Sequence, residues 1–354
     1  MAIIDVKAKW NLKENNWCMN PTHNDKGRAF SFVNYEEIID DVNKGIDYII
    51  LAYGTRVENH SKDFINVKEK AAGIDKIISF YKRSSKNVIV KLLLIDADAP
   101  IIEDAKLLAQ YIDSLSSNDK TNSINLIGVS KCGAMAFNIP KYFQKLTSFY
   151  KTNIYTVATP FTGTKLASPA IFYPDVKKLV SSKLGNNKLA DLVYHAIISY
   201  YEGICSNSHM DYDIAMLGGI PYDKSQYYDD SLIKDMFSDA NIDAISKISC
   251  YKNFVTGIDN NTFGEAVKTM NFTGIGLCIL NDLFFDKKSD GMVMTDAQRI
   301  VETKFVRYDL KSHILISSHH DIASNNRVFS DLLHVVDDTI EEHNDRIKYK
   351  IRKR

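Results

Sequence analysis

One stretch of the chain, from Ser123 to Ala136, constrains its fold more than any other. The stretch reads Ser-Ile-Asn-Leu-Ile-Gly-Val-Ser-Lys-Cys-Gly-Ala-Met-Ala. It begins with an apolar run typical of a buried strand, turns between Gly128 and Gly133, and continues in small residues that a helix tolerates. A strand, a sharp turn and a helix, with a serine at the apex, lift a hydroxyl out of a sheet and present it as a nucleophile. The pattern therefore makes Ser130 a candidate nucleophile.

Other apolar runs of strand length recur along the chain, and helical patterns separate several of them. Strands that alternate with helices predict a parallel sheet covered by helices on both faces. We therefore expect an α/β fold with a mostly parallel central sheet, with residues 1–44 at its periphery. The expected strands span 30–35, 47–53, 87–95, 153–160, 251–258 and 304–310, and the expected helices span 67–84, 101–115, 188–201 and 326–344.

Residues 161–249 differ from the rest because helical patterns occur there without a strong strand signal. We interpret this segment as a helical cap inserted into a single domain that spans residues 1–354. A chain of 354 residues is long enough to bury a sizeable core in one large α/β domain. The aromatic and aliphatic content of the cap suits an acyl chain better than a charged substrate.

The composition bears on several classes of function. The chain has 44 basic and 44 acidic residues, and this balance gives no support for nucleic-acid binding. Its five cysteines are scattered without a Cys-x-x-Cys pair, so zinc and dithiol chemistry are not indicated and a reducing compartment fits best. No apolar run is long enough to span a bilayer, and no signal peptide is visible. We expect a cytoplasmic protein, or one exported without a cleaved signal peptide.

A serine hydroxyl is a poor nucleophile unless a base removes its proton, and that base needs an acid to orient it. Asp290 and His319 follow Ser130 in an order described for such triads. Both Ser130 and Asp290 also have simpler interpretations, because serine often caps helices and Asp-Gly is a common turn pair. His320 is the alternative base. The alternative acids are Asp259, Asp282 and Asp286.

Five motifs in order resemble the α/β-hydrolase superfamily and, within it, bacterial triacylglycerol lipases and esterases. The resemblance covers residues 48 to about 330. The motifs are the oxyanion loop Leu51–Thr55, the nucleophile elbow Leu126–Gly133, the segment Val157–Thr164 after the next strand, the acid motif Ser289–Val293 and the base motif Ser318–Asp321.

The resemblance implies a catalytic triad of Ser130, Asp290 and His319, with an acyl-enzyme formed on the serine. It also implies an oxyanion hole made by the backbone N–H groups of Thr55 and Lys131. The expected activity is hydrolysis of carboxylic esters of acyl or lipid-like substrates. A thioesterase, a phospholipase or an acyltransferase uses the same triad, and a catalytically silent protein that binds through its cap is a further alternative. The cap is expected to touch a membrane surface transiently, and the oligomeric state stays open.

Some residues depart from the family pattern. Cys132 stands where the family usually has glycine, so we expect the turn to shift to hold a thiol. Tyr53 replaces the histidine of the oxyanion loop, and Pro140 should end the helix after the elbow early. Some of the similar lipases hold a structural calcium through an aspartate at the position of Asp321. Asp321 and Asn325 supply too few oxygens for the roughly six to eight that calcium takes, so no metal or other cofactor is expected.

Overall fold

The structure of the chain is a computed structural model, and every structural statement below refers to the residues that it describes. These are residues 3–7, 9–11, 16–19, 29–39, 44–55, 65–66, 68–84, 86–96, 101–161, 163, 169–207, 231–258, 264, 289–290, 293, 295, 298, 313–315, 322 and 326–352.

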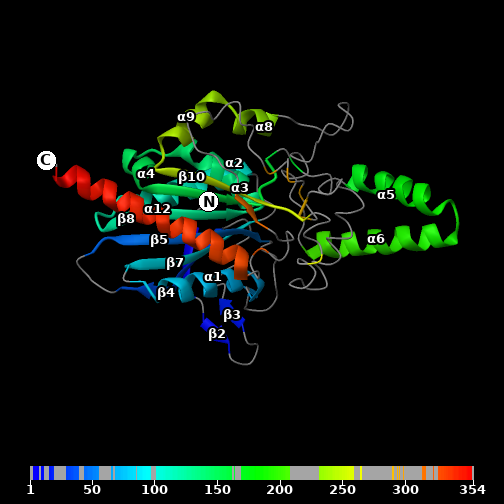
Figure 1. The fold of residues 1–354 in the computed structure, drawn as a ribbon, viewed down its shortest axis with the longest axis horizontal. Helices are drawn as coiled ribbons and strands as arrows, with labels where there is room; N and C mark the ends of the chain where they lie inside the picture. The colour runs from blue at the N-terminus through cyan, green and yellow to red at the C-terminus, as the bar shows by residue number, and fades with distance from the viewer. Residues whose placement is uncertain are drawn as a thin grey trace.

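Eight strands form the main sheet of the described residues (Figure 1). They are β1 (Ile3–Lys7), β4 (Ala29–Ile38), β5 (Ile46–Thr55), β7 (Val88–Asp96), β8 (Thr121–Val129), β9 (Thr152–Val157), β10 (Cys250–Thr256) and β11 (His313–Leu315). The order across the sheet is β1-β4-β7-β5-β8-β9-β10-β11. β4 and β7 run antiparallel, and the other neighbours run parallel. The expectation of a mostly parallel central sheet is confirmed.

Helices cover both faces of this sheet because successive side chains of a strand point to opposite faces. Ile49 and Leu51 of β5 pack in a buried cluster with α1 and α12, and Figure 1 shows these two helices on one face of the sheet. The alternate residues Tyr48, Ile50 and Ala52 pack in a second cluster with α2 and α3. Burial on both faces explains why the central strands are near-continuous apolar runs. The four helices are α1 (Lys68–Tyr81), α2 (Ile101–Ser116), α3 (Lys131–Asn138) and α12 (Asn326–Arg352).

Smaller elements complete the described part of the chain. Three short strands that lie along the chain between strands of the main sheet form a second sheet, in the order β2-β3-β6. The helix α3 has eight residues and passes into the 3-10 helix η1, which contains Pro140 near its start, so the expectation of a short helix is confirmed. These elements are β2 (Lys9–Asn11), β3 (Asn16–Met19), β6 (Ile65–Asn66), η1 (Ile139–Tyr142) and α4 (Leu146–Lys151).

The structure extends one of these expectations, differs from a second and does not describe a third. Residues 1–44 contribute β1 and β4 to one edge of the main sheet. The last helix runs to Arg352 rather than ending near residue 344, because no glycine or proline interrupts it. The expected strand 304–310 lies outside the described residues, whereas β11, which was not expected, pairs with β10.

The described regular elements within 161–249 are all helices: α5 (Pro169–Leu184), α6 (Lys188–Asn207), α8 (Ser231–Met236) and α9 (Asp239–Lys247). Figure 1 shows α5 and α6 side by side as a hairpin that projects from the body. Met236 and Ile245 join the buried cluster of α2 and α3, so α8 and α9 pack on the body instead. A single domain with a cap over 161–249 stays a prediction. No helix in the described ranges combines the length and the apolarity of a membrane span.

Candidate active site

Ser130 lies at the apex of the turn between β8 and α3. Its φ of 57° and ψ of −124° form a sparsely populated conformation that costs a residue other than glycine about 1–3 kcal/mol. Two backbone hydrogen bonds of 2.9 Å hold it, because its N–H donates to the Val157 carbonyl and its carbonyl accepts from the Gly133 N–H. The hydroxyl makes no capping bond to α3. The simpler interpretation as a capping serine is therefore wrong.

Two glycines make this turn possible. A Cβ atom on Gly128 would lie 2.4 Å from the carbonyl oxygen of Cys132, and one on Gly133 would lie 1.7 Å from Oγ1 of Thr159. Both distances are well inside van der Waals contact, so a larger residue would push α3 away from the sheet. The side chain of Cys132 is buried among apolar residues of the α2 and α3 cluster. The backbones therefore approach most closely at Gly128 and Gly133. The thiol of Cys132 fits between them because its side chain packs into the apolar cluster.

Lys131 is the first residue of α3, at a helix end whose N–H groups the helix itself does not use. Its side chain is buried, and its Nζ lies 3.5 Å from Oδ2 of Asp104, which is also buried on α2. Removing one member of a buried ion pair leaves an uncompensated charge and is strongly destabilising. The pair therefore ties the start of α3 to α2, next to Ser130.

Asp290 is fully buried beside the last residue of β10. The hydroxyl of Thr256 donates to Oδ2 over 2.7 Å, and Nε2 of Gln298 donates to the same oxygen over 3.2 Å. The N–H of Val293 donates to Oδ1 over 2.8 Å. If Asp290-Gly291 were only a turn, that turn would explain the hydrogen bond from the Val293 N–H but not the other two. The other two bonds position the carboxylate from outside its own turn.

The described site residues follow neighbouring strands of one sheet. Ser130 follows β8, and Thr55 is the last residue of β5, which pairs with β8. Asp290 contacts the end of β10, and β9 separates β10 from β8. Strands lie about 4.8 Å apart, so the ends of β8 and β10 are roughly 10 Å apart, or two spacings. A gap of this size suits two side chains that are joined through one imidazole.

Comparison of the sequence with models of known families and with curated proteins finds no match. Solved structures do match: the mature form of a lipase from Bacillus licheniformis has a TM-score of 0.50 at 13% identity, over 86% of this chain and 97% of that one. The chain has the α/β-hydrolase fold. The propeptide form of that lipase matches with a TM-score of 0.45 at 12% identity, over 88% and 54% of the two chains. A lipase-esterase related protein from Clostridium acetobutylicum matches with a TM-score of 0.34 at 12% identity, over 82% and 95%.

Sequence reasoning missed two residues of this candidate site, Thr256 and Gln298. Besides its bond to Asp290, the Gln298 side chain accepts from the Thr256 N–H over 2.7 Å and donates to the Thr256 carbonyl over 3.0 Å. Thr256 could have been identified as a candidate from the sequence, because it is a polar residue at the end of an apolar strand. No sequence signal marked Gln298, because only the fold brings it to β10.

We expect Thr256→Val to lower the free energy of unfolding by about 2 kcal/mol, since it removes a buried hydrogen bond to a carboxylate without changing the side-chain shape. Chemical denaturation measures this loss. Thr121→Val is the matched control, because Thr121 is buried at the start of β8 and its hydroxyl donates to the carbonyl of Leu115. The control should lose about 1 kcal/mol or less. Equal losses in the two variants would contradict a specific role of Thr256 in holding Asp290.

Several expected residues lie outside the described part of the chain. They include both candidate bases, His319 and His320, the possible calcium ligand Asp321, and the rival acids Asp259, Asp282 and Asp286. The backbone of Thr55 is described, but its side chain and that of Tyr53 are not. Within the described residues, no group of three or more His, Cys, Asp or Glu residues is arranged to hold a metal. The absence of a metal or other cofactor stays a prediction.

Proposed function

We propose that the protein is a serine hydrolase that cleaves carboxylic esters of acyl or lipid-like substrates through Ser130, His319 and Asp290. The strained turn at Ser130 carries this proposal. Backbone strain of this kind is retained where the surrounding structure needs it, and it clusters at active sites. The similarity in fold to a Bacillus licheniformis lipase is consistent with an ester substrate.

His319 is the base in this proposal because of the strand that precedes it. β11 ends at Leu315, which pairs with Thr256 of β10, and Thr256 contacts Asp290. Four residues of extended chain span at most about 14 Å. This length is compatible with a base at His319 that contacts Asp290. His320 is one residue further along and is the alternative base.

The reaction has two halves. Oγ of Ser130 attacks the ester carbonyl carbon while the imidazole takes the hydroxyl proton, and Asp290 orients the imidazole. The tetrahedral intermediate collapses to an acyl-enzyme when the alcohol leaves with that proton. Water then attacks the acyl-enzyme with the imidazole as base and releases the acid and the free serine. The N–H groups of Lys131 and Thr55 are the proposed donors to the oxyanion, and one such donor contributes about 3–4 kcal/mol.

A fluorophosphonate probe tests this proposal on the intact protein, because it phosphonylates a serine only when a base has activated it. We expect one adduct, and peptide mapping by mass spectrometry should place it on the peptide that contains Ser130. Heat-denatured protein is the control and should not react. An intact protein that takes up no probe would favour a silent binding protein of the same fold. An adduct on another serine would refute the assignment of Ser130.

A further inference from the structure

The tip of the α5–α6 hairpin has a well-defined backbone. Gly185 ends α5 with a φ of 73°, and its N–H donates to the Ser181 carbonyl over 2.9 Å. Asn187 caps α6, because its Oδ1 accepts from the N–H of Ala190 over 3.0 Å and its Nδ2 donates to the Leu184 carbonyl over 2.6 Å. Such caps stop both helices at defined positions. The side chains at the tip are therefore presented on a rigid support.

The helix α6 is apolar on two sides. Ala190 and Ile198 are 4% and 8% exposed. Leu189 and Leu192 lie on another side of the helix and are 57% and 68% exposed. Ala196, which is also exposed, extends this second side at helical spacing. The described part of the chain leaves this apolar stripe open to solvent.

Exposed apolar side chains concentrate at this tip. Six large apolar side chains are exposed in the described residues, and three of them, Leu184, Leu189 and Leu192, lie within nine consecutive residues. A cluster of this kind marks an interaction surface, whereas single exposed apolar residues are ordinary. The other three are Ile39, Leu146 and Tyr150.

Exposed lysines lie on the same two helices as the three leucines. Between residues 177 and 192 the sequence has four lysines, all exposed, and one acidic residue, Asp191. The local net charge is therefore +3, four minus one, whereas the whole chain has no net charge. The four lysines are Lys177, Lys178, Lys183 and Lys188.

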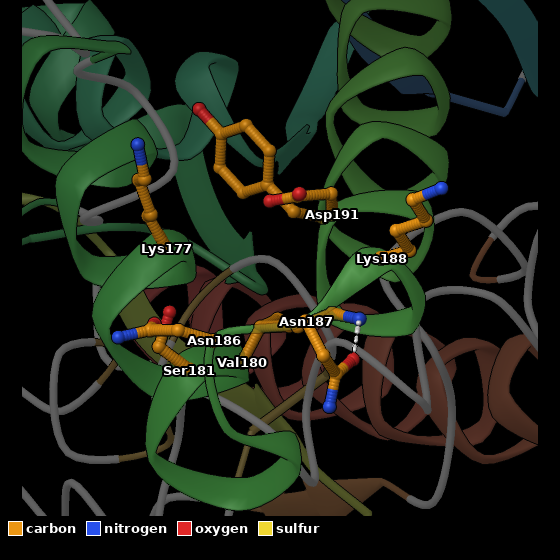
Figure 2. Close-up of a pocket in the computed structure, with 9 residues that line it drawn as sticks. Lys177, Val180, Ser181, Asn186, Asn187, Lys188 and Asp191 are labelled. Atoms are coloured by element: carbon orange, nitrogen blue, oxygen red, sulfur yellow. Dashed lines mark hydrogen bonds between the residues drawn. The ribbon is translucent and has the colours of Figure 1, made fainter.

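A hollow separates the two helices near the tip. Its volume is about 340 Å³, and its lining includes the polar Ser181 and Asn186 and the carboxylate of Asp191. Figure 2 shows Lys177 of α5 and Lys188 of α6 on opposite sides of this hollow. Exposed lysines on both helices suit the phosphates of a bilayer surface, and the neighbouring leucines suit the acyl region below them.

We propose that the α5–α6 hairpin docks the protein on an anionic phospholipid bilayer. The three leucines enter the boundary between headgroups and acyl chains, and the four lysines contact the phosphates. Helices that combine an exposed apolar stripe with lysines bind at such interfaces. A symmetric pair of hairpins would bring two clusters of like charge together, so a second copy of the chain fits this surface less well. The inference rests on the hairpin and not on the hydrolase reaction.

Cosedimentation of the full-length protein with vesicles tests the docking. One set of vesicles is phosphatidylcholine alone, and the other contains roughly one-third phosphatidylglycerol. We expect at least about tenfold tighter binding to the anionic vesicles, because each lysine near an anionic surface contributes about fivefold in affinity. High salt should weaken this binding, since it screens exposed charges.

Two variants locate the docking surface, and each has a matched control. The double variant Leu189→Ser with Leu192→Ser should weaken binding to anionic vesicles by about tenfold or more. Its control is Leu146→Ser, because Leu146 is 66% exposed on α4, outside the hairpin. Lys177→Gln with Lys188→Gln should weaken binding by about fivefold for each lysine. Its control substitutes two exposed lysines elsewhere, Lys82→Gln with Lys120→Gln.

Both controls should bind like the parent, and unfolding curves verify that every variant folds. Equal binding of the parent to the two vesicle types would overturn the proposal, as would hairpin variants that bind as tightly as the parent. If the parent does not bind vesicles and is a dimer, whereas the variant Leu189→Ser with Leu192→Ser is a monomer, the surface would be assigned to self-association. No ester is hydrolysed in this assay, so its failure would leave the proposed hydrolase reaction standing. Absence of probe on Ser130 would likewise leave the docking standing.

Discussion

Replacing Ser130 with alanine is expected to lower kcat/KM for a p-nitrophenyl ester by roughly 10⁴–10⁶-fold, because loss of the nucleophile disables the triad as a unit. Fluorophosphonate labelling should disappear in the same variant. Ser114→Ala is a matched control, since Ser114 is exposed on α2 and its hydroxyl donates a hydrogen bond to the carbonyl of Tyr111. The control should keep the parent's rate. A Ser130→Ala protein that turns over the ester at the parent's rate would refute the serine-hydrolase proposal.

The strained backbone offers a second readout at the same position. Ser130→Gly should raise the free energy of unfolding by about 1 kcal/mol, because glycine adopts a φ of 57° with little strain. It should also abolish turnover, because it removes the hydroxyl. A variant that gains stability while it loses activity would show that the strain is retained for function. A loss of stability would indicate that the Ser130 side chain contributes to the fold.

Replacing His319 with alanine is expected to reduce turnover of the same ester by roughly 10⁴-fold or more, because no base then activates Ser130. His320→Ala should keep most of the activity, because Asp321 lies two residues after His319, as in the base motif that this segment resembles. This pair is its own matched control, since the two residues are neighbours of the same type. Initial rates at saturating and at low ester concentration separate kcat from KM. The opposite result would assign the base to His320.

The elbow could be predicted because its constraints are local. A sharp turn between a buried strand and a helix needs glycine where the backbones approach, and Gly128 and Gly133 are such positions. The positive φ of Ser130 follows from the same geometry. The position of Cys132 was less clear from the sequence. Whether a thiol fits there depends on the cluster around it, which α2 and β9 supply from distant parts of the chain.

The partners of Asp290 could not be predicted because they come from separate segments. Thr256 is 34 residues before Asp290 in the chain, and Gln298 is eight residues after it. The end of β10 brings the three side chains together. An Asp-Gly pair alone is equally compatible with a surface turn. Full burial and donors from outside the turn set this aspartate apart.

The sequence by itself determined the alternation of strands and helices, the strand–turn–helix unit at Ser130 and the order of the candidate triad, because periodicity, glycines and residue types are local properties. The tertiary structure decided the order of strands in the sheet, the hydrogen-bond partners of Asp290 and the exposure of Leu189 and Leu192 on α6. Each of these depends on which distant segments pack together. A helical pattern indicates an apolar face, but only the fold shows which face is left uncovered.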